Sequence, residues 1–271
     1  MEIREYTPEN LRALQLAELD MLIELDRICR KHEIDYIIDA GTLLGAVRHG
    51  GFIPWDDDID VRMLRPDYDK FCEVCKTELR EQFFLQNHET DMGYRWGYAR
   101  ILKNGTVYRR VGQDNMTARN GVFIDVFPND NLPESFWAYK ECTIVSWLCR
   151  KILYSEVGVR NGKSKLRRFG FFLLNLLPKE WGHKGMRYLS NKYRNREVKR
   201  VRCFGWGSKE ETGGFLKEWN IETKDILFEG LTVRAPRDIE GFLVYSFGED
   251  YMQYPPVEKR KPAHTADYIS F

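Results

Sequence analysis

GTLLGAVRHGGFIPWDDDIDV, residues 41–61, holds four glycines, one arginine and four aspartates. The pattern predicts a glycine turn that leads into a short helix, then a second turn, and then an acidic strand over residues 57–63. Side chains alternate along a strand, so we expect Asp58 and Asp60 on the same face. Two carboxylates beside a glycine turn are typical of a site for a hard divalent cation and a phosphate.

A third carboxylate lies in a second predicted strand, over residues 121–127. Phe123, Asp125 and Phe127 share one face of that strand, and Pro128 is expected to end it. An unpaired Asp125 among bulky apolar side chains is costly to bury, which favours a functional role. We therefore expect Asp58, Asp60 and Asp125 to hold Mg²⁺ or Mn²⁺; the alternative for each is an ordinary solvated or capping aspartate.

Other residues of the opening stretch are candidates for binding a phosphorylated substrate. Gly41 and Thr42 would place backbone N–H groups and a hydroxyl at a helix N-terminus, which suits a phosphate. Arg48 offers a planar guanidinium for the same charge, and Trp55 offers a ring to stack on a base. Asp57 either shapes the turn or binds the substrate. The alternatives are a plain strand-to-helix turn, a surface salt bridge and a core tryptophan.

Four further cations are candidates for binding the same substrate. Arg100 and Lys103 flank a predicted strand that ends at the turn after residue 103, and residues 106–110 are expected to return as its hairpin partner. Arg260 and His264 belong to a basic tail that is expected to fold back over the site. Solvated charges at a strand end and a disordered tail are the alternatives.

Composition bounds the kind of protein. The chain has 271 residues, 43% hydrophobic and 31% charged, which is ordinary for a globular protein. Its formal net charge of +1 gives no reason to expect nucleic acid as a partner. The first 30 residues lack a secretory pattern, no run of 18 apolar residues occurs, and the cysteines show no disulfide spacing. We therefore expect a reducing cytoplasm as the compartment.

Charge is distributed unevenly along the chain. Residues 134–202 contain 17 Lys and Arg against 5 Asp and Glu, together with many aromatic residues. Helices are expected over residues 135–153, 167–177 and 180–202. Such helices either lie on an anionic membrane surface or pack their own core with a solvated basic face. Trp137, Trp147 and Trp181 with Phe169, Phe171 and Phe172 are the aromatic residues on which the membrane interpretation depends.

Three segments of the sequence resemble the LicD family, which includes fukutin and fukutin-related protein. The family signature Gly-Thr-Leu-Leu-Gly-x-x-Arg, followed by Ile-Pro-Trp-Asp-Asp-Asp-Ile-Asp, is complete within residues 41–60. Tyr254 stands where the family pattern often has leucine. The second and third segments match at Ile124, Asp125, Phe127, Pro128 and Asp130, and at Gly248, Asp250, Tyr251, Met252, Pro255, Pro256, Lys259, Arg260 and His264.

The resemblance implies an α+β fold of the nucleotidyltransferase type, a small mixed sheet with helices. It implies a catalytic core over residues 1–133, a basic aromatic helical subdomain over residues 134–202, and a segment over residues 203–271 that completes the core and donor site. By resemblance, Asp58 and Asp60 are metal ligands, and Asp125 is the third ligand and a possible base for the acceptor hydroxyl.

The resemblance also implies an activity. Bacterial members of the family are similar to enzymes that move phosphocholine from CDP-choline to a hydroxyl of a cell-surface glycan, such as lipopolysaccharide or teichoic acid, or of its lipid-linked precursor, releasing CMP. The fukutin branch uses a CDP donor of ribitol phosphate. The expected partners are a CDP-alcohol and a glycan acceptor, at the inner face of the cell membrane. A nucleotidyltransferase, a metal-dependent glycosyltransferase and a non-catalytic sugar- or nucleotide-binding protein are the alternatives.

Overall fold

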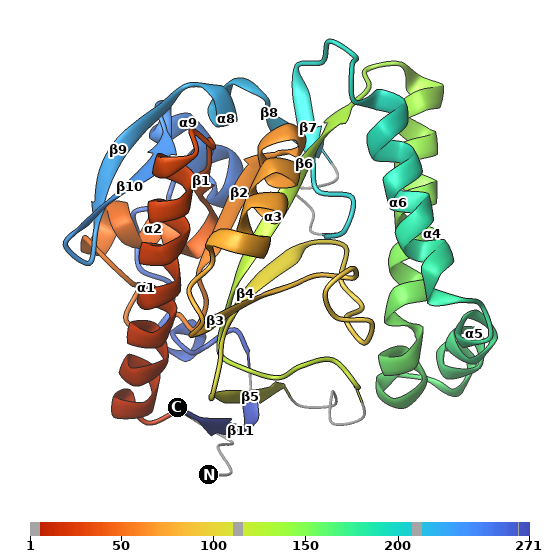
Figure 1. The fold of residues 1–271 in the computed structure, drawn as a ribbon, viewed down its shortest axis with the longest axis horizontal. Coiled ribbons are helices and arrows are strands. Elements are labelled where there is room, and N and C mark those ends of the chain that lie inside the picture. The colour runs from red at the N-terminus through yellow and green to blue at the C-terminus, as the bar shows by residue number, and fades with distance from the viewer. Residues whose placement is uncertain (1–5, 111–115, 208–212, 265) are drawn as a thin grey trace.

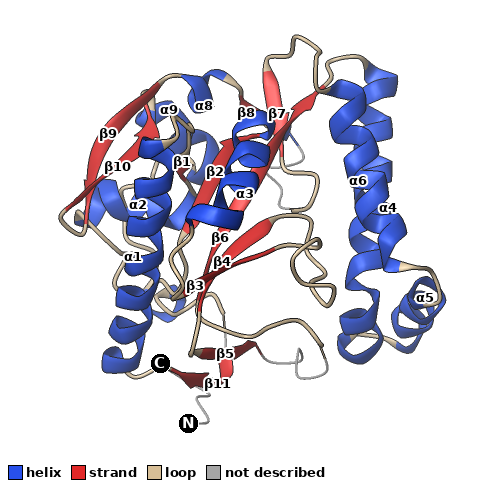
Figure 2. Ribbon diagram, in the orientation of Figure 1, coloured by secondary structure: helices blue, strands red, loops and turns tan. Residues whose placement is uncertain are grey.

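The structure, a computed structural model, describes residues 6–110, 116–207, 213–264 and 266–271, and it confirms the expected α+β class (Figures 1 and 2). The helices are α1 (Pro8–Lys31), α2 (Ala40–His49), α3 (Arg65–Glu78), α4 (Phe136–Asn161), α5 (Lys165–Asn175), α6 (Lys179–Tyr193), α8 (Glu218–Ile221), α9 (Ile239–Phe247) and the 3₁₀ helix η1 (Val257–Lys259). The strands are β1 (Ile37–Ile38), β2 (Asp60–Leu64), β3 (Phe83–Gln86), β4 (Ala99–Lys103), β5 (Val107–Arg110), β6 (Phe123–Leu132), β7 (Arg200–Arg202), β8 (Phe215–Leu216), β9 (Thr223–Phe228), β10 (Leu231–Pro236) and β11 (Ala266–Ser270).

A seven-stranded mixed sheet forms the centre of the molecule. Its strands run in the order β1-β2-β6-β4-β3, and β7 joins the far end of β6 and carries β8 on its other side. The β2–β6 pair is parallel, while β1–β2, β4–β6 and β3–β4 are antiparallel. The strands β9 and β10 form a separate hairpin, and β11 pairs with β5. The two strands that carry the predicted acidic residues are therefore direct neighbours.

Helices α1 and α3 cover one face of this sheet (Figure 1). The start of α1 follows its sequence signals, because Thr7 Oγ1 accepts a hydrogen bond from the Asn10 N–H at 3.2 Å and a proline opens the helix. Its buried face includes Leu14, Met21 and Ile28, at helical spacing, and these residues belong to the main hydrophobic core.

Helices α4, α5 and α6 form a separate layer at the β7 side of the sheet (Figure 1). Helices α4 and α6 bury a second apolar cluster that includes Cys149, Leu153 and Leu189. The basic helix expected over residues 180–202 is too long, because α6 ends at Tyr193 and residues 200–202 pair with the free end of β6 as β7. The three-part division of the chain remains a prediction.

Strand β6 does not end at Pro128, as the sequence predicts, but continues to Leu132. The N–H of Asp125 points to β2, where it donates to the Ile59 carbonyl at 3.0 Å. Because N–H directions alternate along a strand, position 128 faces the opposite side, where the register with β4 has ended at Val126. A proline there removes no ladder hydrogen bond, so the strand can pass through it.

The hairpin expected between β4 and residues 106–110 does not form. β4 already pairs with β3 on one edge and with β6 on the other, so it has no free edge for a third strand. The Thr106 hydroxyl accepts the Val122 N–H at 2.9 Å, and the chain then leaves the sheet. β5 instead pairs with β11, which brings the C-terminal segment back towards α1.

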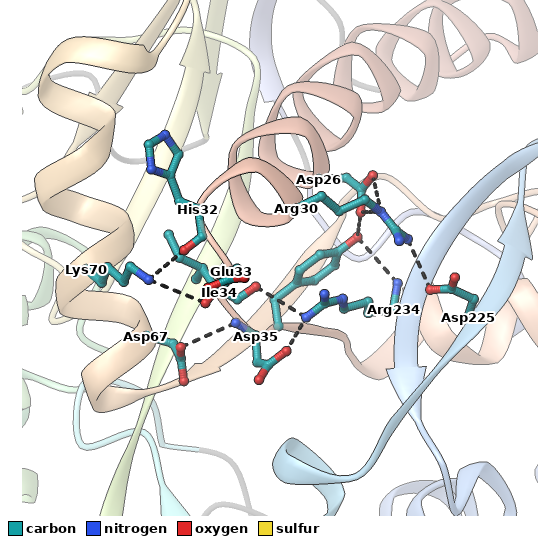
Figure 3. Close-up of polar contacts among 11 residues, drawn as sticks. Asp26, Arg30, His32, Glu33, Ile34, Asp35, Asp67, Lys70, Asp225 and Arg234 are labelled. Carbon is teal, nitrogen blue, oxygen red and sulfur yellow. Dashed lines mark hydrogen bonds and ion pairs between the residues drawn. The ribbon is translucent and has the colours of Figure 1, made fainter.

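A polar network attaches the β9–β10 hairpin to α1 and α3 (Figure 3). Arg30 Nη2 donates to Asp225 Oδ1 at 3.0 Å, and Arg234 forms an ion pair with Asp35. Tyr36 OH donates to Asp26 Oδ1 at 2.6 Å. These contacts hold the hairpin beside β1, at the edge of the sheet where the acidic stretch begins.

Candidate active site

The opening glycine stretch forms the first turn of α2, which follows directly after β1. A Cβ atom on Gly41 would lie 2.4 Å from Asp56 Oδ2, so glycine is needed where this carboxylate lies against the helix. The Thr42 hydroxyl accepts the Asp60 N–H at 3.0 Å and so ties α2 to the start of β2. The helix N-terminus predicted to hold phosphate is thus in contact with the Asp56 carboxylate, which the helix dipole favours.

Asp58 lies in the loop before β2, because the strand begins at Asp60 rather than at residue 57. The buried carboxylate of Asp57 accepts backbone N–H groups from Ala263 at 2.9 Å and from His264 at 3.1 Å. The basic tail therefore folds back, as the sequence predicts, and Asp57 is its anchor. His264 Nδ1 lies 3.4 Å from Asp58 Oδ2.

Asp60 and Asp125 are direct register partners on the parallel strands β2 and β6, so their side chains point to the same face. Arg100 is the register partner of Asp125 on β4, and its Nε donates to Asp125 Oδ1 at 2.6 Å with both side chains 7% exposed. The expectation of an unpaired Asp125 is therefore wrong. Arg100, a predicted diphosphate ligand, is bound to Asp125, with its guanidinium 3.8 Å from the centre of the Phe123 ring.

Burial and mutual repulsion perturb these carboxylates. Burial raises the pKa of Asp58 to about 6, with Asp57 and Asp125 adding to the shift and His264 opposing it. Burial, and then the charges of Asp58 and Asp125, raise the pKa of Asp60 well above its usual range. A cluster of oxygen donors that repel one another fits a hard divalent cation such as Mg²⁺ or Mn²⁺.

One group of three side chains in the described part of the chain brings its potential metal-ligand atoms within 4.8 Å of one another. It consists of Asp57, Asp58 and His264. Asp58 is common to this group and to the predicted set, whereas Asp60 and Asp125 lie outside it.

Glu18 on α1 is a carboxylate that the sequence analysis did not select. It is 2% exposed, and its Oε2 has no hydrogen-bond partner. Burial, followed by the charges of Asp58 and Asp57, raises its pKa well above the usual value. Gln15, one turn earlier on the same face of α1, donates to the Asp56 carbonyl at 3.0 Å. The signal for Glu18 was a charged residue on the apolar face of a helix.

A cluster of cations and aromatic rings lies at the C-terminal end of α2. Arg48 Nη1 donates to the carbonyls of Tyr251 and Gln253, both at 3.1 Å. The Tyr254 ring lies 5.1 Å from the Arg48 guanidinium and 5.2 Å from that of Arg260. Trp55 is the second ring beside Arg260, at 5.7 Å. The predicted donor ligands Arg48, Trp55 and Arg260 are therefore brought together around Tyr254.

Lys103 is not brought to the acidic residues. It lies three residues beyond Arg100 on β4 and so points to the other face of the sheet. Its Nζ donates to Asp20 Oδ2 on α1 at 2.6 Å. Lys103 is therefore a solvated charge at a strand end, which was the alternative to binding the substrate.

Comparison with known proteins identifies relatives of the chain. Residues 33–148 match the family model described as LicD/FKTN/FKRP, nucleotidyltransferase domain. The lipopolysaccharide cholinephosphotransferase LicD of Haemophilus influenzae is 29% identical over 269 residues, covering 94% of this chain and 96% of that protein. An uncharacterised protein of Rickettsia prowazekii is 34% identical over 140 residues, covering 50% of this chain and 47% of that protein.

Proposed function

The chain belongs to the LicD family, and on that premise we propose that it transfers phosphocholine, or a similar phospho-alcohol, from a CDP-activated donor to a glycan hydroxyl. The glycan is a cell-surface glycan or its lipid-linked precursor, and CMP is the second product. The name of the Haemophilus influenzae relative supports choline phosphate as the transferred group and lipopolysaccharide as the acceptor. The observation that carries the proposal is that Asp60 and Asp125 are register partners on neighbouring strands, and that the charge of Asp125 acts on Asp58.

Mg²⁺ or Mn²⁺ is part of this proposal. We assign Asp58, Asp60 and Asp125 as its ligands, with Asp57 and His264 beside Asp58. When bound, the cation would neutralise negative charge on the donor diphosphate. The unpartnered Glu18 oxygen and the raised pKa values of Asp58 and Asp60 are consistent with a cluster that gains stability from a counter-charge.

The residues then have distinct tasks in the transfer. The acceptor hydroxyl oxygen attacks the distal phosphorus of the donor, the bond from that phosphorus to the CMP oxygen breaks, and phosphocholine remains on the acceptor. We assign Asp125 as the general base: its carboxylate, which Arg100 holds in position, would accept the proton of the acceptor hydroxyl. Arg48 and Arg260, beside Trp55 and Tyr254, are our candidates for holding the CDP part of the donor.

Product analysis tests this function. Purified protein with CDP-choline, Mg²⁺ and a lipopolysaccharide acceptor is expected to release CMP and to label the glycan with phosphocholine. Release of pyrophosphate would instead indicate a nucleotidyltransferase, and release of CDP a transferase of another group. A thermal-shift series with CDP-choline, CDP-ribitol, CDP-glycerol and UDP-sugars identifies the donor, since a ligand that binds only the folded state raises the melting temperature.

Replacing one proposed metal ligand distinguishes an enzyme from a protein that only binds the donor. Asp58→Ala is expected to abolish CMP release, whereas Asp225→Asn, which changes an exposed aspartate paired with Arg30, is expected to retain it. Full turnover by the Asp58 variant would refute the metal assignment. Donor binding by the wild-type protein without any product would favour a non-catalytic binding protein.

We also propose that the protein works in the cytoplasm and contacts the inner face of the membrane through α5. Phe169 and Phe172 on this helix are 58% and 49% exposed, and none of its residues is buried. Lys165, Arg167 and Arg168 lie in the same helix, which suits an anionic surface. No helix among the described residues has the length and apolar content to cross a bilayer. Co-sedimentation with phosphatidylglycerol vesicles that is lost on changing both phenylalanines to serine would support this contact.

A further inference from the structure

A cavity of about 450 Å³ lies between α4 and the segments 95–98 and 205–207, beside Tyr98, whose hydroxyl lies 3.5 Å from Arg100 Nη2. We call it the tryptophan pocket, and its lining includes Trp96, Trp147, Tyr154 and Trp206. The rings of Trp96 and Tyr154 are 6.3 Å apart and inclined by 31°. A volume of this size and several aromatic walls are typical of a small-molecule site. Trp147 and Trp206 are 52% and 41% exposed, so a ligand can reach these rings from solvent.

The same pocket is positively charged. Its lining contains Arg95, Arg150 and Lys151 and, among the described residues that form it, no carboxylate. Arg150 Nη1 donates to the Phe204 carbonyl at 2.9 Å, which orients the guanidinium. Lys151 Nζ lies 6.0 Å from the centre of the Trp147 ring. Glu156 Oε2 lies 3.5 Å from Arg95 Nε and offsets one of these charges, so Arg150 and Lys151 are the cations that would attract an anion.

Side-chain contacts connect the floor of the pocket to the proposed reaction centre. The backbones of Gly97 and Gly205 touch there, since a Cβ on Gly205 would lie 2.6 Å from the Gly97 carbonyl. The neighbouring Tyr98 also lines the pocket, and Arg100 Nη2 lies 3.5 Å from its hydroxyl. Because Arg100 binds Asp125, two side chains, Tyr98 and Arg100, connect the pocket to the Asp125 carboxylate.

We propose that the tryptophan pocket binds an anionic sugar unit of the acceptor glycan, one that carries a phosphate or a carboxylate, next to the unit whose hydroxyl reacts. One face of a sugar ring exposes C–H groups that pack on aromatic rings, and its hydroxyls accept hydrogen bonds from indole N–H groups. The anionic substituent would pair with Lys151 and Arg150. This inference rests on the proposed function, because it assigns the acceptor of that transfer.

Calorimetric titration of the full chain tests the pocket without turnover. The probes are glucose 6-phosphate, glucose and inorganic phosphate. Glucose 6-phosphate is expected to bind at least about tenfold more tightly than either of the other two, because only it engages both the rings and the cations. Equal binding of inorganic phosphate would overturn the sugar site in favour of a simple anion site.

Matched variants on α4 locate the binding. Trp147→Ala and Lys151→Gln are each expected to weaken glucose 6-phosphate binding about tenfold. Trp137→Ala and Lys140→Gln are the controls, since Trp137 is also exposed and Lys140 also lies over a ring, 5.6 Å from Phe136. Unchanged binding in the pocket variants would overturn the assignment. Loss of phosphatidylglycerol vesicle binding in Trp147→Ala with unchanged sugar binding would likewise overturn it and assign the rings to the membrane.

Failure of the pocket and failure of the proposed function give different results. The Asp58→Asn protein is expected to lose CMP release and to keep glucose 6-phosphate binding. A wild-type protein that binds glucose 6-phosphate through Trp147 and Lys151 but never releases CMP from CDP-choline would refute the function and leave the pocket standing. A protein that releases CMP normally but binds none of the three probes would refute the pocket alone.

Discussion

Replacing Arg100 with methionine is expected to destabilise the protein strongly. Arg100 and Asp125 are each 7% exposed and are joined at 2.6 Å, so the variant leaves a buried carboxylate without its counter-charge. Breaking one side of a buried ion pair typically costs about 3–5 kcal/mol. With an unfolding entropy of about 2.1 cal/mol/K per residue, that loss corresponds to a decrease of roughly 5–9 °C in melting temperature for 271 residues. Urea unfolding followed by circular dichroism measures it.

The double variant Arg100→Met with Asp125→Leu isolates the interaction. Since replacing both partners by apolar side chains removes both desolvation costs, its stability is expected to return to within about 1 kcal/mol of the wild type. Lys103→Met is the matched control on the same strand, because the exposed pair with Asp20 contributes about 0–1 kcal/mol. A loss below about 1 kcal/mol for Arg100→Met, or additive single losses, would refute the importance of this pair.

Three further expectations concern the acidic stretch. Because the folded-state pKa of Asp58 is raised to about 6, the stabilisation from its protonation is present at low pH and is lost as pH rises through 6. The metal-free protein is therefore expected to be about 1 kcal/mol more stable at pH 5 than at pH 7.5, a difference that Mn²⁺ abolishes in thermal melts. Thr42→Val removes the acceptor of the Asp60 N–H and is expected to cost about 1–3 kcal/mol in urea unfolding, against a negligible loss for Thr42→Ser. Asp57→Ala frees residues 263–264, so limited proteolysis is expected to cleave the C-terminal segment faster, and an unchanged rate would contradict its role as the anchor.

Local signals specify the elements whose causes lie within a few residues of each other. The N-terminal helix follows from Thr7 and the proline after it, and the hairpin over β9 and β10 follows from its turn at Glu229 and Gly230, both of which have positive φ. The alternation around Asp125 placed that residue on one face of a strand. Such predictions succeed because hydrogen bonds, caps and side-chain periodicity are properties of neighbouring residues.

Errors arose where strand pairing decides the outcome. Pro128 is an ordinary strand breaker by sequence, and it is tolerated here because β4 has already ended beside it. Residues 106–110 were predicted to pair with the nearest strand, β4. Both edges of β4 are occupied, and β11 is the partner of residues 107–110. The identity of a strand's neighbour depends on contacts between residues far apart in the sequence, which no local pattern records.

By itself, the sequence predicted the α+β class, which the structure confirms, the resemblance to the LicD family, and the carboxylates at residues 58, 60 and 125 as a ligand set, which stays a prediction. The tertiary structure decided which charges meet: Arg100 binds Asp125, Asp57 binds the returning tail, and Glu18 faces the aspartates from α1. The physical reason is that residue type sets which interactions are possible, while strand register and helix packing set the few ångströms within which charges interact.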